Sequence, residues 1–321
     1  MSLITELSSL SPDRPVVLTV GKFDGVHIGH QHLLARLRRR AAELGAASAA
    51  MILHPNPVTV VRPGTSVYYL TTLEERVKLL CQQGLDYVLV QEFTREFSQT
   101  TADDFIAGLL QHMRLVEIWE GPAFALGRGR QGTVPYLRAM GERLGFTVHE
   151  VSRLSIMGET VSTSLIRRLL GEDDIAQAAW LLGRPHAISG PVIHGAKRGR
   201  DLGFPTANLD IPEDIIVPGY GVYAVRCKLG DEWLDGVASI GVRPTFDHGP
   251  RSVEVYLLDF DRQIYGETLR VDFIAYLRPE LRFEGVQALI DQMGRDIENG
   301  RAALRAPIPL HLPIPDGNLS M

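Results

Sequence analysis

Cysteine is scarce in this chain, and long apolar runs are absent. The 321 residues include two cysteines, Cys81 and Cys227, which stand far apart and outside any Cys-x-x-Cys or Cys/His spacing. The sequence therefore predicts two reduced thiols, and neither a disulfide framework nor a zinc site. No stretch reaches the roughly 18 apolar residues of a membrane span, and Glu6 stands where a signal peptide would carry basic residues. We expect a cytoplasmic protein with no membrane partner.

An excess of positive charge is absent as well. The 33 Lys and Arg residues are outnumbered by 38 Asp and Glu residues, which gives a formal net charge of -5. Such a chain has no general attraction for nucleic acid. A nucleic-acid-binding regulator is suggested only by the cluster Arg36, Arg38, Arg39 and Arg40, and a solvated helix face explains that cluster better. We therefore expect no nucleic-acid partner, and a monomer or a weak homo-oligomer.

Strands and helices alternate in the first half of the chain. Apolar runs predict buried strands at residues 15–20, 49–53, 87–90, 115–119 and 146–151. Helical spacing predicts helices over residues 33–44, from residue 73, and over 101–113 and 134–144. Thr72-x-x-Glu75 and Thr101-x-x-Asp104 are capping patterns at two of the helix starts. This alternation predicts an α/β domain with a Rossmann-like parallel sheet and right-handed crossovers.

The second half has a different character. Two short helical stretches, 164–170 and 175–182, end at Gly183-Arg184-Pro185, where we place a domain boundary. The β-rich runs beyond it predict a small antiparallel β-barrel with strands at 223–227, 236–240, 252–257 and 269–275. Apolar residues from Phe283 to Ile297 predict a terminal helix, and the proline-rich tail is predicted to be disordered. The expected domains are 1–183 and 184–305, followed by the tail 306–321.

A loop rich in glycine and histidine joins the first strand to the first helix. It reads Gly21-Lys22-Phe23-Asp24-Gly25-Val26-His27-Ile28-Gly29-His30, at the position where an open α/β sheet binds ligands. Glycines let the backbone approach a ligand, the helix N-terminus favours phosphate, and His27 and His30 can donate hydrogen bonds to phosphoryl oxygens. An isolated pair of histidines would indicate ordinary loop or cap residues. The strand, the glycines and the helix in register favour a nucleotide site instead.

This loop resembles the His-x-Gly-His signature of the nucleotidylyltransferase superfamily, whose members add a nucleotide monophosphate to an acceptor and release pyrophosphate. The resemblance implies that His27 and His30 are catalytic and stabilise charge at the α-phosphate and the departing pyrophosphate. It assigns ATP contacts to Gly21, Phe23, Asp24, Gly25 and Gly29. The segment Val161–Arg167 resembles the superfamily's Ser/Thr-rich turn, which assigns phosphate contacts to Ser162, Thr163 and Arg167. A plain helix N-cap explains the hydroxyls of that segment equally well.

A second glycine-rich segment is strongly cationic. It reads Gly195-Ala196-Lys197-Arg198-Gly199-Arg200-Asp201-Leu202-Gly203-Phe204-Pro205-Thr206-Ala207-Asn208. Backbone N–H groups and basic side chains can hold phosphates in such a loop. Thr206 and Asn208 alternate along an extended strand and so point the same way, which brings together two oxygen ligands suited to Mg²⁺. A solvated basic turn before a strand is the plain alternative.

The string Gly-Arg-x-Leu-Gly-Phe-Pro-Thr-Ala-Asn is very similar to the riboflavin kinase signature, and the resemblance continues through residues 218–224, 238–246 and 253–260. It implies that Glu254 is the base that deprotonates the riboflavin 5′-hydroxyl, and that Thr206 and Asn208 bind Mg²⁺. It also assigns ATP contacts to Gly195, Lys197, Gly199 and Arg200. Flavin contacts are assigned by resemblance to Asn56, Phe124 and Arg243.

In this order, the two halves resemble the bacterial bifunctional riboflavin kinase/FMN adenylyltransferases, also called FAD synthetases, over about residues 16–304. The resemblance implies that riboflavin and ATP give FMN and ADP at the barrel. FMN and a second ATP would then give FAD and pyrophosphate at the α/β domain, with Mg²⁺ in both steps. The implied partners are therefore small molecules, namely ATP, riboflavin, FMN and FAD.

The chain departs from the family pattern in one informative segment. Family members show Gly-x-Asp/Asn-Phe-x-Phe-Gly, whereas this chain reads Gly121-Pro122-Ala123-Phe124-Ala125-Leu126-Gly127, so Ala123 replaces a polar side chain. Lys22 and Ser239 are further departures. The loss at Ala123 leaves open a monofunctional riboflavin kinase with a weakened or inactive first domain. The string His-Ile-Gly-His also suggests an aminoacyl-tRNA synthetase. The sequence contains no loop of the Lys-Met-Ser-Lys-Ser type, which argues against that class of enzyme.

Overall fold

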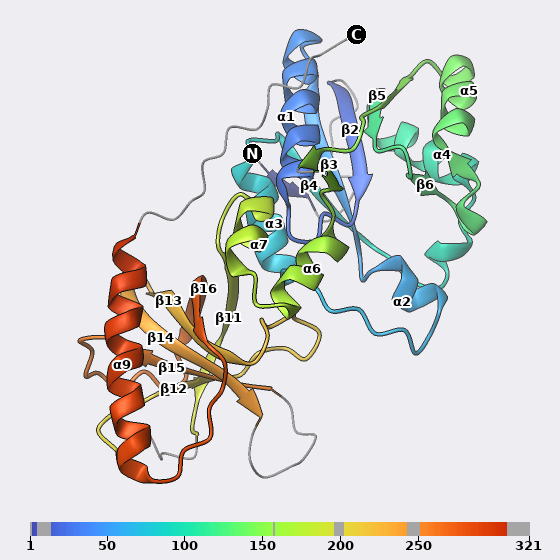
Figure 1. Cartoon of the computed structure of the whole chain (residues 1–321). Helices are drawn as coiled ribbons and strands as arrows, with labels where there is room; N and C mark the ends of the chain where they lie inside the picture. Colours follow the sequence, from blue (N-terminus) through green and yellow to red (C-terminus); the bar gives the residue numbers. More distant parts are fainter. Residues whose placement is uncertain (1, 5–13, 157, 196–201, 243–250, 307–321) are drawn as a thin grey trace. The chain divides into compact units, whose positions relative to one another are not determined.

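The computed structural model describes residues 2–4, 14–156, 158–195, 202–242 and 251–306. The chain divides into two compact units, residues 1–163 and 164–321, and each is described separately (Figure 1). The division between the units lies before the expected boundary at Gly183. The helix α7 (Ile175–Leu182) therefore belongs to the second unit. The assignment of one activity to residues 1–183 and another to 184–305 stays a prediction.

A parallel sheet of six strands forms the first unit. Its strands, in spatial order, are β1 (Ser2–Ile4), β4 (Tyr87–Glu92), β3 (Ala47–His54), β2 (Pro15–Gly21), β5 (Arg114–Glu120) and β8 (Thr147–Glu150). All five pairings between them are parallel. The predicted α/β fold is confirmed, and β1 is a strand that the sequence analysis missed. The strand order reverses between β2 and β5, which is where an open α/β sheet binds ligands.

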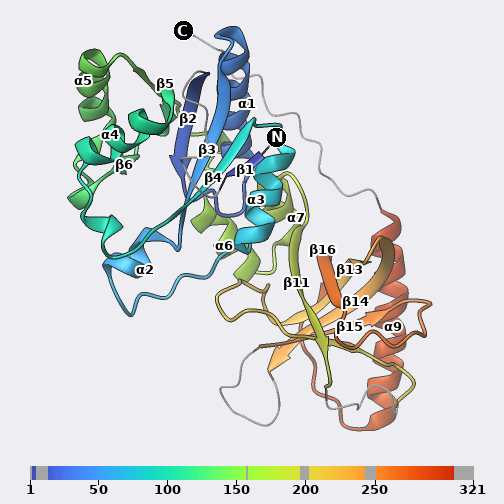
Figure 2. The ribbon, with the colours of Figure 1, turned by 180° about the vertical axis from the view of Figure 1, so that it is seen from behind.

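Helices cover both faces of this sheet. On one face, Leu18 of β2 shares a core with α4 (Ala102–His112) and α5 (Val134–Leu144). On the other face, Val17 shares a core with α1 (Ile28–Glu43) and α3 (Leu73–Gln82), as Figures 1 and 2 show. Because β2 is buried on both faces, it reads in the sequence as a continuous apolar run.

Short elements complete the first unit, and the expected caps are present. The Thr72 side chain accepts a hydrogen bond from Glu75 N, and Thr101 accepts one from Asp104 N, which confirms both capping predictions. The remaining elements are α2 (Pro57–Val61), η2 (Phe97–Gln99), β6 (Ala125–Leu126), η3 (Arg128–Arg130), β7 (Gly132–Thr133), β9 (Ser155–Ile156) and β10 (Glu159–Thr160). The helix α6 (Thr163–Gly171) follows β10.

A closed antiparallel barrel forms the second unit and confirms the predicted barrel. Its strands, in spatial order, are β11 (His186–Ile193), β12 (Ala207–Leu209), β15 (Arg251–Leu257), β14 (Glu232–Val242), β13 (Gly221–Leu229) and β16 (Thr268–Arg278). The pairing of β16 with β11 closes the barrel. The sequence analysis missed β11, whose pattern is broken by Gly190 and Pro191. A Cβ atom at Gly190 would overlap the backbone of Asp210, so the break reflects close packing.

The terminal helix is longer than predicted. It is α9 (Val286–Arg305), and it packs against β13, β14 and β16. The tail predicted to be disordered lies, from residue 307 onwards, outside the described residues. Both cysteines are free, and burial raises the pKa of the Cys227 thiol. In the described ranges, no helix combines the length and the apolarity needed to cross a bilayer.

A buried histidine makes the stability of the barrel depend on pH. His186 is 1% exposed, its Nε2 lies 3.1 Å from the Ile216 carbonyl oxygen, and its ring stacks on Phe273. Burial lowers the pKa of His186 to about 4. In the unfolded chain a histidine has a pKa of about 6.5, so the unfolded state binds the additional proton. The stabilisation is therefore fully present above pH ~6.5 and is lost as the pH falls towards the folded-state pKa.

We predict that His186→Gln flattens this dependence. Between about pH 7 and pH 5, the free energy of unfolding of the unmodified chain should fall by about 2 kcal/mol more than that of the variant. Denaturant titration of the full chain at both pH values measures the difference. The matched control is His194→Gln, because His194 is an exposed histidine that directly follows β11, the strand that begins with His186. Parallel losses in His186→Gln and the unmodified chain would contradict the prediction.

Candidate active sites

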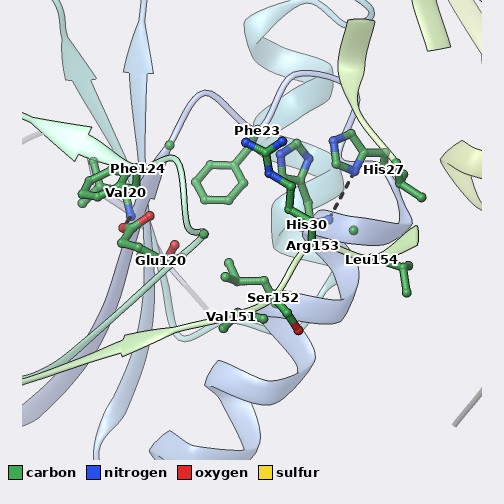
Figure 3. A pocket seen from close by; sticks show the side chains of 16 residues that line it. Val20, Phe23, His27, His30, Glu120, Phe124, Val151, Ser152, Arg153 and Leu154 are labelled. Carbon is green, nitrogen blue, oxygen red and sulfur yellow. Dashed lines mark hydrogen bonds between the residues drawn. The ribbon is translucent and has the colours of Figure 1, made fainter. Parts of the chain in front are cut away.

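The first candidate site is a pocket at the carboxyl ends of β2 and β5. Its volume is about 250 Å³, and both predicted catalytic histidines line it (Figure 3). The lining residues are Thr19, Val20, Gly21, Phe23, His27, Gly29, His30, Leu33, Glu120, Gly121, Phe124, Val151, Ser152, Arg153, Leu154 and Val161. They come from β2 and the loop after it, from α1, and from the segments that follow β5 and β8. The pocket therefore occupies the point where the strand order reverses.

The two histidines form a stacked pair in the first turn of α1. Their ring centroids are 3.7 Å apart, and His27 Nδ1 accepts a hydrogen bond from His30 N at 3.3 Å. A Cβ atom at Gly29 would lie 3.2 Å from the His27 ring, so glycine leaves the space for this stacking. Unpaired N–H groups at the start of a helix attract anions. The pair is thus placed to contact phosphoryl groups.

The His30 side chain is held in its neutral form. Burial lowers the pKa of His30 well below its ordinary value, and His27, Arg76 and Lys22 lower it further. Its Nδ1 is buried without a hydrogen-bond partner among the described residues. An anion bound beside this ring would raise the pKa of His30, because an opposite charge favours the protonated form. Binding of a polyphosphate is therefore expected to be coupled to proton uptake.

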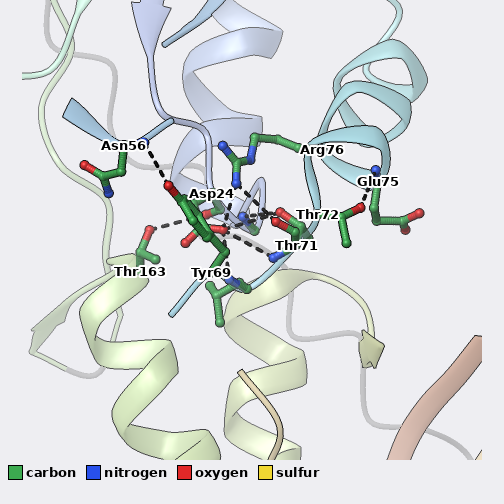
Figure 4. A network of polar contacts seen from close by, with 10 residues as sticks. Asp24, Asn56, Tyr69, Thr71, Thr72, Glu75, Arg76 and Thr163 are labelled. Atoms are coloured by element: carbon green, nitrogen blue, oxygen red, sulfur yellow. Dashed lines mark hydrogen bonds and ion pairs between the residues drawn. The ribbon is translucent and has the colours of Figure 1, made fainter. Parts of the chain in front are cut away.

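The buried side chain of Asp24 anchors the loop of residues 21–30, which carries the two histidines (Figure 4). This carboxylate is 3% exposed, accepts hydrogen bonds from Leu70 N at 2.9 Å and Thr71 N at 3.3 Å, and pairs with Arg76 at 3.5 Å. The Arg76 side chain is also buried and lies 5.2 Å from the centre of the Tyr69 ring. Asp24 therefore ties the loop after β2 to the segment that enters α3. It does not line the pocket, so its predicted ATP contact stays a prediction.

The pocket brings together some of the predicted residues of the first unit and leaves others outside. Gly21, Phe23, His27, Gly29, His30 and Phe124 line it, whereas Gly25, Asn56, Ser162 and Thr163 do not. Asn56 caps α2 by accepting from Val58 N at 3.2 Å. The Thr163 hydroxyl donates to the Asp24 carbonyl oxygen at 3.3 Å. Arg167 lies on α6 in the second unit.

The sequence analysis missed several residues of this pocket. Glu120 and Gly121 end β5 or follow it directly, and Val151, Ser152, Arg153 and Leu154 follow β8. The rule that parallel sheets bind ligands at the carboxyl ends of their strands would have found them. The anchor residues Tyr69, Thr71 and Arg76 were also missed. The local capping pattern pointed only to Thr72.

Glu120 is an acidic residue in a pocket that otherwise suits an anion. It is 4% exposed, and its Oε1 accepts a hydrogen bond from Val20 N at 2.6 Å. Burial raises the pKa of Glu120 well above its ordinary value, and hydrogen bonds from Val20 N and the Thr19 side chain only partly oppose that rise. A protonated Glu120 would place no negative charge in the pocket.

The second candidate site lies on the barrel, where three predicted residues meet. The Thr206 hydroxyl donates to Glu254 Oε2 at 3.1 Å, and Asn208 stands directly opposite Glu254 in the pairing of β12 with β15. On the neighbouring strand β14, Ser239 is also opposite Glu254. Residues paired directly across strands project from the same face. The three oxygen-bearing side chains predicted for catalysis and Mg²⁺ are thus brought together.

The loop before this cluster is only partly described. Gly195 packs directly on Asn208, since a Cβ atom at Gly195 would overlap the Asn208 amide group. The predicted residues Lys197, Gly199, Arg200 and Arg243 lie outside the described residues. Their assignment to ATP and flavin rests on the sequence resemblance alone.

Profiles of two protein families match this chain, one in each half. The FAD synthetase profile matches residues 10–165, and the riboflavin kinase profile matches residues 182–304. Three similar relatives are described as bifunctional riboflavin kinase/FMN adenylyltransferase. The Listeria monocytogenes protein is 36% identical over 288 residues, which cover 89% of this chain and 91% of the relative. The Escherichia coli protein is 38% identical over 300 residues, covering 92% and 96%. The Pseudomonas fluorescens protein is 38% identical over 315 residues, covering 96% and 99%.

A solved structure from Streptococcus pneumoniae is similar in fold along most of the chain. The TM-score is 0.84 at 28% sequence identity, and the match covers 94% of this chain and 98% of that one. That protein is described as a macrolide-efflux protein. The family profiles and the sequence relatives agree instead on flavin enzymes.

We predict that the buried ion pair of Asp24 and Arg76 makes a large contribution to the stability of the first unit. Arg76→Met removes the cation from a buried carboxylate and should lower the free energy of unfolding by roughly 3–5 kcal/mol. Lys78→Met, on the exposed side of the same helix, is the matched control and should change it little. The double variant Asp24→Asn/Arg76→Met should recover part of the loss. Denaturant unfolding measures all four chains, and equal stability of Arg76→Met and Lys78→Met would contradict the prediction.

Proposed function

The chain belongs to the bifunctional riboflavin kinase/FMN adenylyltransferase family, and from this premise we propose that it converts riboflavin to FMN and FMN to FAD. The observation that carries the proposal is the presence of two separate sites, one in each matched half. Thr206, Asn208 and Glu254 meet on the barrel, and His27 stacks on His30 in the first unit. Nothing in the comparisons supports the alternative of a kinase alone, since the FAD synthetase profile matches the first half.

In the proposed kinase reaction, the riboflavin 5′-oxygen attacks the γ-phosphorus of ATP. A new O–P bond forms, the bond between the β- and γ-phosphates breaks, and ADP leaves. Glu254 accepts the proton of the attacking hydroxyl. The Thr206 hydroxyl, which donates to Glu254 Oε2, orients that carboxylate. Glu254 is paired with Asn208 on one neighbouring strand and with Ser239 on the other, and these neighbours further restrict the position of its carboxylate.

The donor set of this site fits Mg²⁺. The Thr206 hydroxyl, the Asn208 amide oxygen and the Glu254 carboxylate supply hard oxygen ligands, which this cation prefers. We propose that Thr206 and Asn208 hold the ion. When bound there, Mg²⁺ supplies positive charge that offsets the charge of the phosphates. Packing of Gly195 against the Asn208 amide keeps that side chain in place for this role.

In the proposed adenylyl transfer, a phosphate oxygen of FMN attacks the α-phosphorus of ATP. An O–P bond forms, the bond between the α- and β-phosphates breaks, and pyrophosphate leaves. His27, His30 and the N-terminus of α1 stabilise the negative charge that develops. Further contacts are proposed for ATP at Gly21, Phe23, Asp24, Gly25, Gly29, Ser162, Thr163 and Arg167, and for flavin at Asn56, Phe124 and Arg243.

The remaining proposals concern the setting of these reactions. We propose that Gly195, Lys197, Gly199 and Arg200 hold the ATP used by the kinase. The chain is further proposed to act as a monomer or a weak homo-oligomer in the cytoplasm. Its proposed partners are flavins and ATP, with Mg²⁺ required in both steps.

The two activities are predicted to separate in single variants. Glu254→Gln removes the base and should slow FMN formation by about 100-fold or more, while adenylylation of supplied FMN continues. His30→Ala removes a donor at the phosphates and should have the reverse effect. The assay incubates the protein with ATP, Mg²⁺ and either riboflavin or FMN, and resolves the flavins by chromatography.

Matched controls are Glu267→Gln and His112→Ala, which change a glutamate and a histidine outside both sites. Both controls should keep both activities. Loss of both activities in either Glu254→Gln or His30→Ala would contradict two independent sites. FMN formation without any FAD from the unmodified chain would reduce the proposed function to the kinase alone.

A further inference from the structure

The first pocket has two chemically different ends. Figure 3 shows His27, His30 and Arg153 towards one side and Glu120 towards the other, with Phe23 between them. The histidine end provides N–H donors, the helix N-terminus and positive charge. Phe124 adds an apolar side chain at the Glu120 end, whereas Leu154 lies near His27 (Figure 3). A ligand with a polyanionic part and a flat, weakly polar part matches this division.

Glu120 is the one carboxyl group among the residues that line this pocket. The other titratable or charged groups that face the pocket are His27, His30 and Arg153. Burial raises the pKa of Glu120, and the hydrogen bonds from Val20 N and the Thr19 side chain oppose that rise only in part. Burial of this carboxyl group favours its neutral form.

From this geometry, and resting on the proposed adenylyl transfer, we propose that Glu120 is a specificity-determining residue that binds the adenosine part of ATP through its carboxyl group. The triphosphate lies at the histidine end, so the nucleoside extends towards β5. A neutral carboxyl has one O–H donor and can still accept hydrogen bonds. Adenine and ribose offer both donors and acceptors, which such a group can satisfy. An ionised carboxylate would have acceptors only and would repel the triphosphate.

The segment that carries Glu120 also contains the departure of this chain from its family pattern. The pattern places a polar side chain at position 123, and this chain has Ala123. Ala123 is exposed and does not line the pocket, while its carbonyl oxygen accepts a hydrogen bond from Arg130. From the same segment, Glu120 does reach the pocket. The end of β5 thus presents a polar side chain to the pocket in spite of the alanine.

The test compares Glu120→Val with Glu120→Gln in FAD formation from FMN and ATP. Valine removes the polar group, so the KM for ATP should rise about tenfold, as expected for one lost hydrogen bond, with a much smaller change in kcat. Glutamine keeps a donor and an acceptor in a neutral side chain, so its KM should rise less than that of the valine variant. Glu142→Gln changes an exposed glutamate of α5 and is the matched control.

Inhibition constants identify the part of ATP that Glu120 contacts. In Glu120→Val, competition by adenosine should weaken about tenfold, whereas competition by inorganic pyrophosphate should stay within about twofold. Weaker competition by pyrophosphate with unchanged competition by adenosine would place Glu120 at the phosphates and overturn the proposal. Equal weakening of both would indicate general disruption of the pocket and would overturn it too.

A pH profile supplies the second readout. The KM for ATP of the unmodified chain should rise at alkaline pH as Glu120 loses its proton, and Glu120→Gln should lack this rise. Because His27, His30 and Arg153 are the same in both chains, the difference between the two profiles isolates Glu120. Identical profiles, or an unchanged KM in Glu120→Val, would refute the role of Glu120. Absence of FAD from the unmodified chain would instead refute the proposed function, so the two failures are distinguishable.

Discussion

The buried carboxylate of Asp24 is the constraint on which the first site depends. It binds Leu70 N, Thr71 N and Arg76 at once, and so ties the loop after β2 to a segment 46 residues further along the chain. The same loop holds Phe23 and Val26 at positive φ, a conformation that non-glycine residues rarely adopt and that the surrounding contacts must maintain. This path of the backbone leads into α1 and places His27 as its cap, so the stacking of His27 on His30 follows from the anchor.

The first pocket suits a polyanion without carrying much charge of its own. Burial and nearby cations keep His30 neutral, and burial favours the neutral form of Glu120. Under the proposed function, the pocket would bind phosphates through N–H donors, a helix N-terminus, neutral polar groups and the Arg153 side chain. Such a pocket would let a chain with a formal net charge of -5 provide the proposed nucleotide site. A bound triphosphate would change the balance by favouring a proton on His30.

The second site is positioned in a different way, by strand register. Asn208, Glu254 and Ser239 are paired across three neighbouring strands of a closed barrel, so the hydrogen-bonded ladder fixes their separations. Thr206 precedes Asn208 by one strand repeat and donates to the same carboxylate. A site built on strands depends little on loop conformation. The two halves thus use separate devices, a buried anchor behind a loop and a barrel register, to place their polar groups.

Local pattern was enough to identify the alternating α/β half, the barrel, the capping threonines and the histidine pair, because each depends on residues close together in the sequence. The spacing of Thr206 and Asn208 also placed two oxygen donors on one side of a strand. Local pattern could not predict contacts between residues far apart in the sequence. Glu120 binds Val20 across 100 residues, Arg76 pairs with Asp24 across 52, and β16 closes the barrel on β11. Such contacts form only when the sheet order and the barrel closure bring distant segments together. The polarity and the protonation of the first pocket therefore belong to the folded chain, since burial, which the fold alone creates, sets both.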